Sequence, residues 1–107
     1  MLIIRYMSET SDVSSSQNYF IYILFSLKDN QLYIGYTTSL ELRMQEHKFG
    51  RVTSTKDRRP LKLVYHEVFI DKNDARAREK FLKSGFGRGQ MKKALKSTLN
   101  KLGYKKI

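Results

Sequence analysis

Arg43 and His47 lie four residues apart in a segment with helical periodicity, and both belong to the face that should pack inward. At about 100° per residue, they share that face with Leu40 and Met44. Burying a charge without a partner is costly, so the two side chains either lie at the rim of a cleft or are paired. In the alternative interpretation, Arg43 reaches out to solvent and His47 is a satisfied surface residue of the helix.

Glu79 is also a charged residue at an inward-facing position, but it is acidic. It lies at the edge of the apolar face of a second helical segment. Ala75, Arg78 and Leu82 lie on the same side of that segment. A carboxylate in this position can act as a hard oxygen ligand for Mg²⁺ at the rim of the same cleft. The alternative is a solvated shoulder, where Glu79 lies beside Arg78 or pairs with Lys83 one helical turn later.

Tyr22 and Tyr33 add two phenol groups, both in segments with strand character. Tyrosines in strands usually belong to the core or to the sheet surface. A phenol has an unperturbed pKa of about 10, which is too high for a good base at neutral pH, although nearby cations lower it. The Arg43 guanidinium can give a forked, charge-assisted contact to an anionic group such as a phosphate.

The elements that must position these side chains begin with a hairpin. Residues 19–27 are aromatic and β-branched, as in a buried strand, and residues 32–37 resume strand character. The short polar segment 28–31 between them has Asp and Asn at its centre, which predicts a turn. The two strands are therefore expected to pair antiparallel.

A helix and a loop are expected to follow the hairpin. Thr38 and Glu41 have the spacing of a capping box, which predicts a helix start there and a helix through residues 39–48. We expect this helix to end near Gly50. The next segment, 51–60, has no periodicity and ends in proline, so it is predicted to be a loop.

The second half of the chain predicts one strand and two helices. Residues 61–69 read as a third strand, and Asp71 can cap a helix over about 72–84 that stops at Gly85. The glycine-rich residues 85–89 are expected to form a flexible break.

A last helix is predicted over about residues 90–102, ended by Gly103. Its predicted core stripe consists of Met91, Ala94, Leu95, Thr98, Leu99 and Leu102. The element order ββαβαα predicts an α+β fold class, with a small three-stranded, mainly antiparallel sheet flanked by about three helices.

Length and composition fit one small domain. The 107 residues suffice for a single modest core, and we expect a disordered polar leader over 1–18 and one domain over 19–107. The chain has no apolar run of membrane-spanning length, which predicts no membrane partner. It also has no cysteine, which excludes disulfides and thiolate metal sites and fits a reducing cytoplasm.

The charge of the chain points to a polyanionic partner. The net charge is +11, and nine Lys and Arg residues but no acidic residue follow Glu79. A solvated basic surface is the alternative to a DNA footprint. We see no base-reading motif, so we expect binding by charge and shape. The predicted DNA-binding residues are Arg51, Lys56, Arg58 and Arg59 in the loop, and Arg88, Lys92 and Lys93 nearer the C-terminus.

These residues occur together in a recognisable order. Tyr22 stands in the sequence FIYIL, Tyr33-Ile34-Gly35 follows, and Arg43, His47 and Glu79 come at later positions. Over residues 19–95 the chain resembles the GIY-YIG nuclease family, and especially its small stand-alone bacterial members, which are related to the N-terminal nuclease domain of the excision-repair C subunit.

The resemblance implies a three-stranded αβ fold and a role for each of the five residues. Tyr22 and Tyr33 correspond to the tyrosines of the two motifs, and either can be the general base. Arg43 corresponds to the arginine that stabilises the transition state, and His47 to the His-or-Tyr position one turn later. Glu79 corresponds to the single protein ligand of a divalent metal ion, Mg²⁺ or Mn²⁺.

Three positions depart from the family pattern. Phe20 replaces the glycine of the first motif, and Tyr36 follows the second motif where the repair branch often has lysine. The late asparagine of that branch has no clear match, although Gln90 lies nearby. Arg58 or Arg59 can make the phosphate contact that Tyr36 does not provide.

Together these features predict a metal-dependent DNA endonuclease that recognises DNA structure, with a role in repair or recombination and a partner protein that supplies specificity. The main alternative is a module of the same fold that binds nucleic acid and cuts nothing. A second alternative is an interaction protein that recruits repair factors.

Overall fold

The computed structural model describes residues 17–105, so most of the leader expected over 1–18 lies outside the described residues. A three-stranded antiparallel sheet in the order β2-β1-β3 forms the centre of the molecule. The predicted α+β fold class and its sheet are confirmed. The elements are β1 (Tyr19–Ser26), β2 (Leu32–Thr37), α2 (Leu40–Lys48), the short 3₁₀ helix η2 (Lys56–Arg58), β3 (Leu61–Phe69), α3 (Lys72–Lys83), α4 (Gly85–Ala94) and α5 (Lys96–Lys101).

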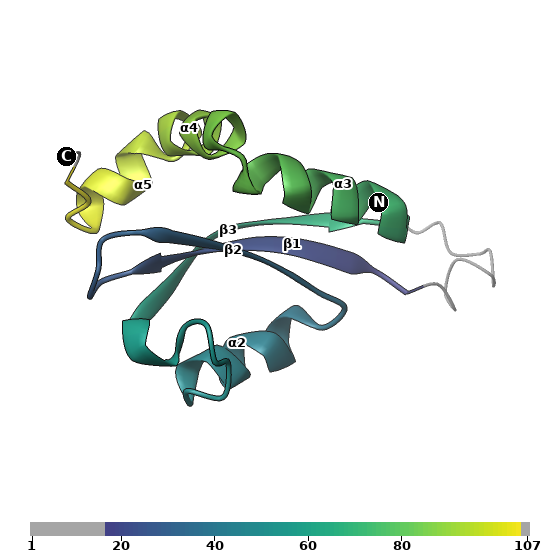
Figure 1. Ribbon diagram of the computed structural model, residues 1–107, viewed down its shortest axis with the longest axis horizontal. Helices are drawn as coiled ribbons and strands as arrows, with labels where there is room; N and C mark the ends of the chain where they lie inside the picture. The colour runs from purple at the N-terminus through teal and green to yellow at the C-terminus, as the bar shows by residue number, and fades with distance from the viewer. Residues whose placement is uncertain (1–16, 106–107) are drawn as a thin grey trace, which may run out of the picture.

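The two faces of the sheet are covered unequally. Helices α3, α4 and α5 lie along one face, and α2 with the loop that follows it lies against the other (Figure 1). The hydrophobic core fills the first face, where Ile21, Ile23 and Phe25 of the central strand pack with Leu82 of α3 and Leu99 of α5. Alternate residues of β1 point to the α2 face because successive side chains of a strand alternate. Tyr22 is therefore on the face opposite the main core.

The β1–β2 hairpin is confirmed, with Tyr22 paired to Gly35 and Leu24 to Tyr33. Its turn contains Asn30 at a φ of 63°, a left-handed conformation that asparagine adopts more readily than most residues. The Ser26 hydroxyl supports the turn by accepting a hydrogen bond from the backbone of Asp29 at 3.0 Å.

The capping box predicted at Thr38 is wrong. The N-cap of α2 is Ser39, whose side chain makes no capping hydrogen bond within the described part of the chain. Instead the Thr37 hydroxyl accepts a hydrogen bond from the Ser39 backbone at 3.1 Å, which orders the entry to the helix. The predicted cap of α3 is confirmed, because the Asp71 carboxylate accepts from the Asn73 backbone at 2.7 Å.

The flexible break predicted over 85–89 is also wrong, because these residues form the first turn of α4. The Ser84 hydroxyl caps this helix by accepting from the Gly87 backbone at 3.1 Å. A Cβ atom at Gly87 would lie 2.1 Å from the Phe81 carbonyl oxygen, so glycine allows α4 to start close against the end of α3. Tertiary packing thus outweighs the low helix propensity of the glycines.

The single last helix predicted over 90–102 is divided into α4 and α5 at Leu95. Met91 and Leu99 are buried, and Leu95 and Leu102 pack against the core, as the stripe predicts. Ala94 and Thr98 are exposed, because the bend at Leu95 turns part of the stripe away from the sheet. Within residues 17–105, no helix has the length and apolar character needed to cross a membrane.

Candidate functional site

A buried hydrogen-bonded chain joins β1, α2 and the loop after α2. The Tyr22 hydroxyl lies 2.7 Å from Nε2 of His47, and Nδ1 of His47 lies 2.7 Å from the Thr55 hydroxyl. The exposed fractions of these three residues are 0%, 2% and 0%. The sequence allowed His47 to lie at the rim of a cleft, to be paired, or to be exposed on the helix surface, and the structure shows it buried and paired. Both of its ring nitrogens have partners, which makes its burial tolerable.

Gly35 makes room for the phenol ring of this chain. Tyr22 lies directly across from Gly35 on the neighbouring strand. A Cβ atom at Gly35 would lie 2.2 Å from Cζ and 2.3 Å from the hydroxyl oxygen of Tyr22. Two non-bonded carbon atoms cannot approach each other so closely, so only glycine lets the Tyr22 ring lie over β2 and reach His47.

Arg43 lies on α2 one helical turn before His47 and faces the same phenol. Its Nε donates to the Tyr22 hydroxyl at 3.4 Å, and its Nη1 donates to the Glu46 carboxylate at 2.9 Å. The side chain is about one-third exposed, with a relative accessibility of 34%. Arg43 is thus held at the border between the buried chain and solvent, where it can contact a phosphate.

Burial controls the protonation of the buried pair. Desolvation raises the pKa of Tyr22 to about 12, although the hydrogen bond from Arg43 opposes the shift. Desolvation, with a smaller contribution from the Arg43 charge, lowers the pKa of His47 to about 4. At neutral pH the phenol therefore keeps its proton and the imidazole is uncharged.

Tyr33 is the more accessible of the two phenols. It lies on the edge strand β2 and is half-buried, with its ring centroid 5.4 Å from that of His47 and 6.3 Å from that of Tyr22. Its hydroxyl accepts a hydrogen bond from Ser54 at 3.3 Å. Tyr33 therefore shares the environment of the buried chain, but its hydroxyl faces solvent.

Glu79 reaches the same region from α3, on the other side of the sheet. Its carboxylate is close enough to Tyr22 to contribute to the raised pKa of that phenol. The two carboxylate oxygens accept from Arg76 at 3.0 Å and from Lys83 at 2.9 Å, and the side chain is only 13% exposed. Burial raises the pKa of Glu79, but the hydrogen bonds from Lys83 and Arg76 outweigh burial and hold this pKa below its usual range.

The residues around Glu79 suit a hard cation that keeps most of its water ligands. Among the described residues, no group of three or more His, Cys, Asp or Glu side chains gathers as in a closed metal cage. A single carboxylate is enough for Mg²⁺, which commonly retains several waters. A metal ion at Glu79 would compete with Arg76 and Lys83 for the carboxylate oxygens. The Glu79–Lys83 ion pair was also the alternative to a metal site that the sequence predicted for Glu79.

The predicted DNA-binding residues line more than one hollow. Arg58 and Arg88 line a hollow of about 430 Å³ at the edge of β2 together with Tyr33. Lys92 and Lys93 line a separate hollow of about 470 Å³ near the C-terminus.

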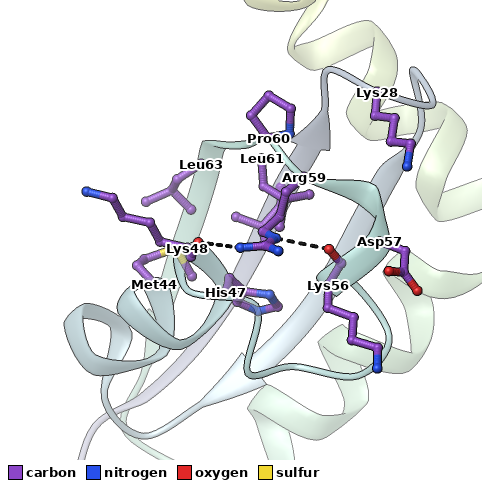
Figure 2. Close-up of a pocket in the computed structure, with 11 residues that line it drawn as sticks. Lys28, Met44, His47, Lys48, Lys56, Asp57, Arg59, Pro60, Leu61 and Leu63 are labelled. Carbon is purple, nitrogen blue, oxygen red and sulfur yellow. Dashed lines mark hydrogen bonds between the residues drawn. The ribbon is translucent and has the colours of Figure 1, made fainter.

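The remaining residues of this set lie near the end of α2. Arg51 is placed with its guanidinium 5.5 Å from the Phe49 ring. Lys56 and Arg59 line a pocket of about 750 Å³ between α2 and β3 (Figure 2). Figure 2 shows the Arg59 guanidinium bridging two backbone carbonyl groups, those of Lys48 at 3.2 Å and Lys56 at 2.9 Å. Arg59 thus ties the loop to α2.

Sequence reasoning missed Thr55, Arg76 and the steric role of Gly35. Thr55 lies in a loop without periodicity, so nothing in its sequence context indicates burial beside a histidine. Arg76 lies three residues before Glu79, a spacing that on a helix does predict an ion pair.

We expect the low pKa of His47 to make the fold sensitive to mild acid. The unfolded chain takes up a proton near the ordinary histidine pKa of about 6.5, whereas folded His47 resists protonation down to about 4. The unfolded state therefore binds more protons between these values, so the free energy of unfolding falls as the pH falls through this window. The total loss is about 3 kcal/mol.

Urea unfolding between pH 4 and 7 measures this loss, and His66 provides the matched control. His66 is the other histidine of the chain and is exposed on β3. His66→Gln should keep the acid sensitivity, whereas His47→Gln should remove most of it. Equal pH profiles for the two variants would contradict the assignment to His47.

Comparisons with known proteins identify a family model and several relatives. The model of the GIY-YIG catalytic domain matches residues 18–94. A UPF0213 protein of Staphylococcus haemolyticus is 44% identical over 78 residues, which cover 72% of this chain and 93% of that protein. The UPF0213 protein YsiG of Lactococcus lactis is 42% identical over 84 residues, which cover 78% of this chain and 80% of that protein.

A solved structure shows a further similarity. The solution NMR structure of a UPF0213 protein from Bacillus halodurans is 34% identical to this chain, with a TM-score of 0.45. The match covers 69% of this chain and 81% of that protein. The UPF0213 relatives are small stand-alone bacterial proteins.

Proposed function

This chain belongs to the GIY-YIG catalytic domain family, and we propose that it is a metal-dependent DNA endonuclease that hydrolyses phosphodiester bonds. The observation that carries the proposal is the grouping of side chains around Tyr22. Arg43 and His47 contact its hydroxyl, the Tyr33 ring lies 6.3 Å away, and Glu79 approaches from α3. A cation and two phenols thus lie together at the border with solvent, and the Glu79 carboxylate is near enough to influence the Tyr22 phenol.

In this proposal, Arg43 contacts the phosphate directly and Glu79 acts on it through a metal ion. Arg43 donates to the nonbridging oxygens, where negative charge accumulates in the transition state. Glu79 would hold one divalent ion, Mg²⁺ or Mn²⁺, and such an ion would supply Lewis-acid chemistry at the phosphate. The alternative pairing of Arg43 with Glu46 keeps its guanidinium oriented while no substrate is bound.

Tyr33 is our choice for the general base. Tyr22 is fully buried, and its pKa of about 12 leaves almost no phenolate at neutral pH. Tyr33 is half-buried and lines the open hollow at the edge of β2, so an attacking water can approach its hydroxyl. Tyr22 then acts as a positioning residue, which holds Arg43 and His47 through its hydroxyl.

Two tyrosine variants distinguish these roles. Tyr33→Phe should lower kcat by about 10²-fold, because it removes a proton acceptor, and should leave stability almost unchanged. Tyr22→Phe should lower the free energy of unfolding by about 1–3 kcal/mol, because Nε2 of His47 loses its buried partner. Single-turnover cleavage and urea unfolding of both variants measure the split. A full kcat in Tyr33→Phe would exclude Tyr33 as the base.

We further propose that DNA is bound by charge and shape and not by base sequence. The net charge of +11 supports a polyanionic substrate, and its contribution to binding should fall steeply with salt. A role in DNA repair or recombination, with a partner protein that supplies specificity, would suit an enzyme of this kind, and a DNA substrate fits the cytoplasmic location expected from the sequence.

The catalytically silent module remains the second candidate, and one observation favours it. Both oxygens of Glu79 are engaged by basic side chains, as in a purely structural ion-pair cluster. Cleavage of labelled plasmid, duplex, flap and four-way-junction DNA with Mg²⁺ or Mn²⁺ separates the two candidates. Salt-sensitive binding without cutting of any substrate would support the silent module.

A further inference from the structure

A hollow of about 430 Å³ at the outer edge of β2 joins the two sides of the sheet. Tyr33 lines it from β2 itself. Arg58 comes from the loop on the α2 side, whereas Lys83 and Arg88 come from α3 and α4 on the opposite side. Three cationic side chains from separate elements thus surround one space beside the proposed base.

Arg88 is the unusual member of this group. Its Nε atom is buried and has no hydrogen-bond partner within residues 17–105. Leaving a charged donor buried without an acceptor is costly, and natural proteins contain few such groups. Asp29 also lines the hollow, but its carboxylate pairs with Arg58 and not with Arg88. Arg88 as a whole is half-buried, so its unpartnered Nε leaves one donor of the guanidinium available to an anion in the hollow.

Lys83 connects the hollow to the proposed metal ligand. It lines the hollow, and its Nζ lies 2.9 Å from a carboxylate oxygen of Glu79. An anion in the hollow would offer Lys83 a second partner. If Lys83 moves to that anion, one oxygen of Glu79 becomes accessible.

We propose that this hollow is a phosphate subsite, which seats the backbone phosphate next to the one that is cut. The inference rests on the proposed function, because Tyr33 and the Lys83–Glu79 pair place the hollow directly beside the reaction centre. Arg88 and Lys83 hold the phosphate, and the Arg58–Asp29 pair forms the wall on the α2 side. Occupation of the subsite draws Lys83 away from one carboxylate oxygen of Glu79, and that oxygen becomes accessible to a metal ion.

The first test is binding without metal, so that it does not depend on cleavage. Isotope-labelled protein is titrated with trithymidylate and with inorganic phosphate while the Arg88 Nε–H resonance is followed by NMR. Both probes should shift this resonance. Arg88→Gln should weaken trithymidylate binding about tenfold and reduce the slope of log K against log salt by about 0.7.

Lys62→Gln is the matched control, because Lys62 is an exposed cation on β3 at the opposite edge of the sheet. It removes the same charge and should leave trithymidylate binding unchanged. Arg88→Lys keeps the charge and should recover part of the affinity.

Thermal unfolding separates a binding role of Arg88 from a purely structural one. If Arg88 serves a ligand, Arg88→Gln should keep or slightly raise Tm, because a buried donor without a partner is removed. If Arg88 serves the fold, the same variant should lower Tm, and this result would overturn the subsite.

The outcomes also separate this inference from the proposed nuclease activity. Loss of binding in Arg88→Gln, in a protein that cuts no DNA, would support phosphate binding in the hollow and reject the nuclease. Cutting by the wild type, with trithymidylate binding unaffected by Arg88→Gln and an unshifted Nε–H resonance, would support the nuclease and reject the subsite.

Discussion

Glu79→Gln is expected to lower the rate of DNA cleavage by at least about 10³-fold. The metal ion is expected to contribute several kcal/mol to the transition state, and about 4 kcal/mol corresponds to 10³ in rate. A neutral amide keeps the size of the side chain but removes the charge that attracts Mg²⁺. Single-turnover cleavage in Mg²⁺ measures the loss, and excess Mn²⁺ should restore little of it.

The structure predicts that this variant still folds. Arg76 and Lys83 are each about half exposed, with relative accessibilities of 54% and 52%, so their ion pairs with Glu79 contribute only about 0–1 kcal/mol. Tm should therefore change little, and DNA binding should persist because a negative charge is removed. Inactivity would then report the chemistry and not the loss of structure.

Glu41→Gln supplies the matched control, because Glu41 is exposed in the first turn of α2. It should cut DNA at the wild-type rate. If Glu79→Gln cuts within tenfold of Glu41→Gln, Glu79 does not hold a required metal ion. Titration of the wild type with Mn²⁺ addresses the silent module, which should bind no metal at Glu79.

The sequence predicts the sheet well because its signals are local and strong. An aromatic, β-branched segment, a polar turn and a second strand leave only one pairing, and the hairpin has the expected arrangement. The errors fall where a distant contact outweighs a local preference. The glycines at 85–89 predict a break, yet they form the start of α4, because the Ser84 hydroxyl caps this helix and Gly87 fits close to the Phe81 carbonyl where a Cβ atom would clash.

In the candidate site, too, local sequence patterns predict some features, whereas distant contacts determine the others. The face shared by Arg43 and His47 follows from helical periodicity, and so does their unusual inward direction. The environments of Tyr22 and Tyr33 do not follow from it, because both have similar strand contexts. Only the sheet order separates them, since β1 is central and covered whereas β2 is an edge strand. The sequence also does not predict Thr55 as the hydrogen-bond partner of His47, because Thr55 lies in an aperiodic loop.

Gly35→Ala is expected to damage both the fold and the activity, although it adds a single methyl group. Its Cβ atom would lie 2.2 Å from Cζ of Tyr22, so the phenol ring must move by more than a small adjustment. Overpacking of this kind costs about 1–3 kcal/mol. The displaced hydroxyl would also leave His47 and Arg43, and a misplacement of about 1 Å can cost 10²-fold in rate. We therefore expect at least that loss in kcat.

Gly89→Ala is the matched control, because this variant should change the free energy of unfolding in the opposite direction. Gly89 lies in α4, and an added Cβ there meets no atom within 4 Å among the described residues. Alanine should therefore stabilise the protein by about 0.5–1 kcal/mol, the usual gain for glycine to alanine in a helix. Urea unfolding of both variants should give opposite changes. If Gly35→Ala were also neutral or stabilising, the Tyr22 ring would not lie over β2, and the hydrogen-bonded chain to His47 and Thr55 would lose its structural basis.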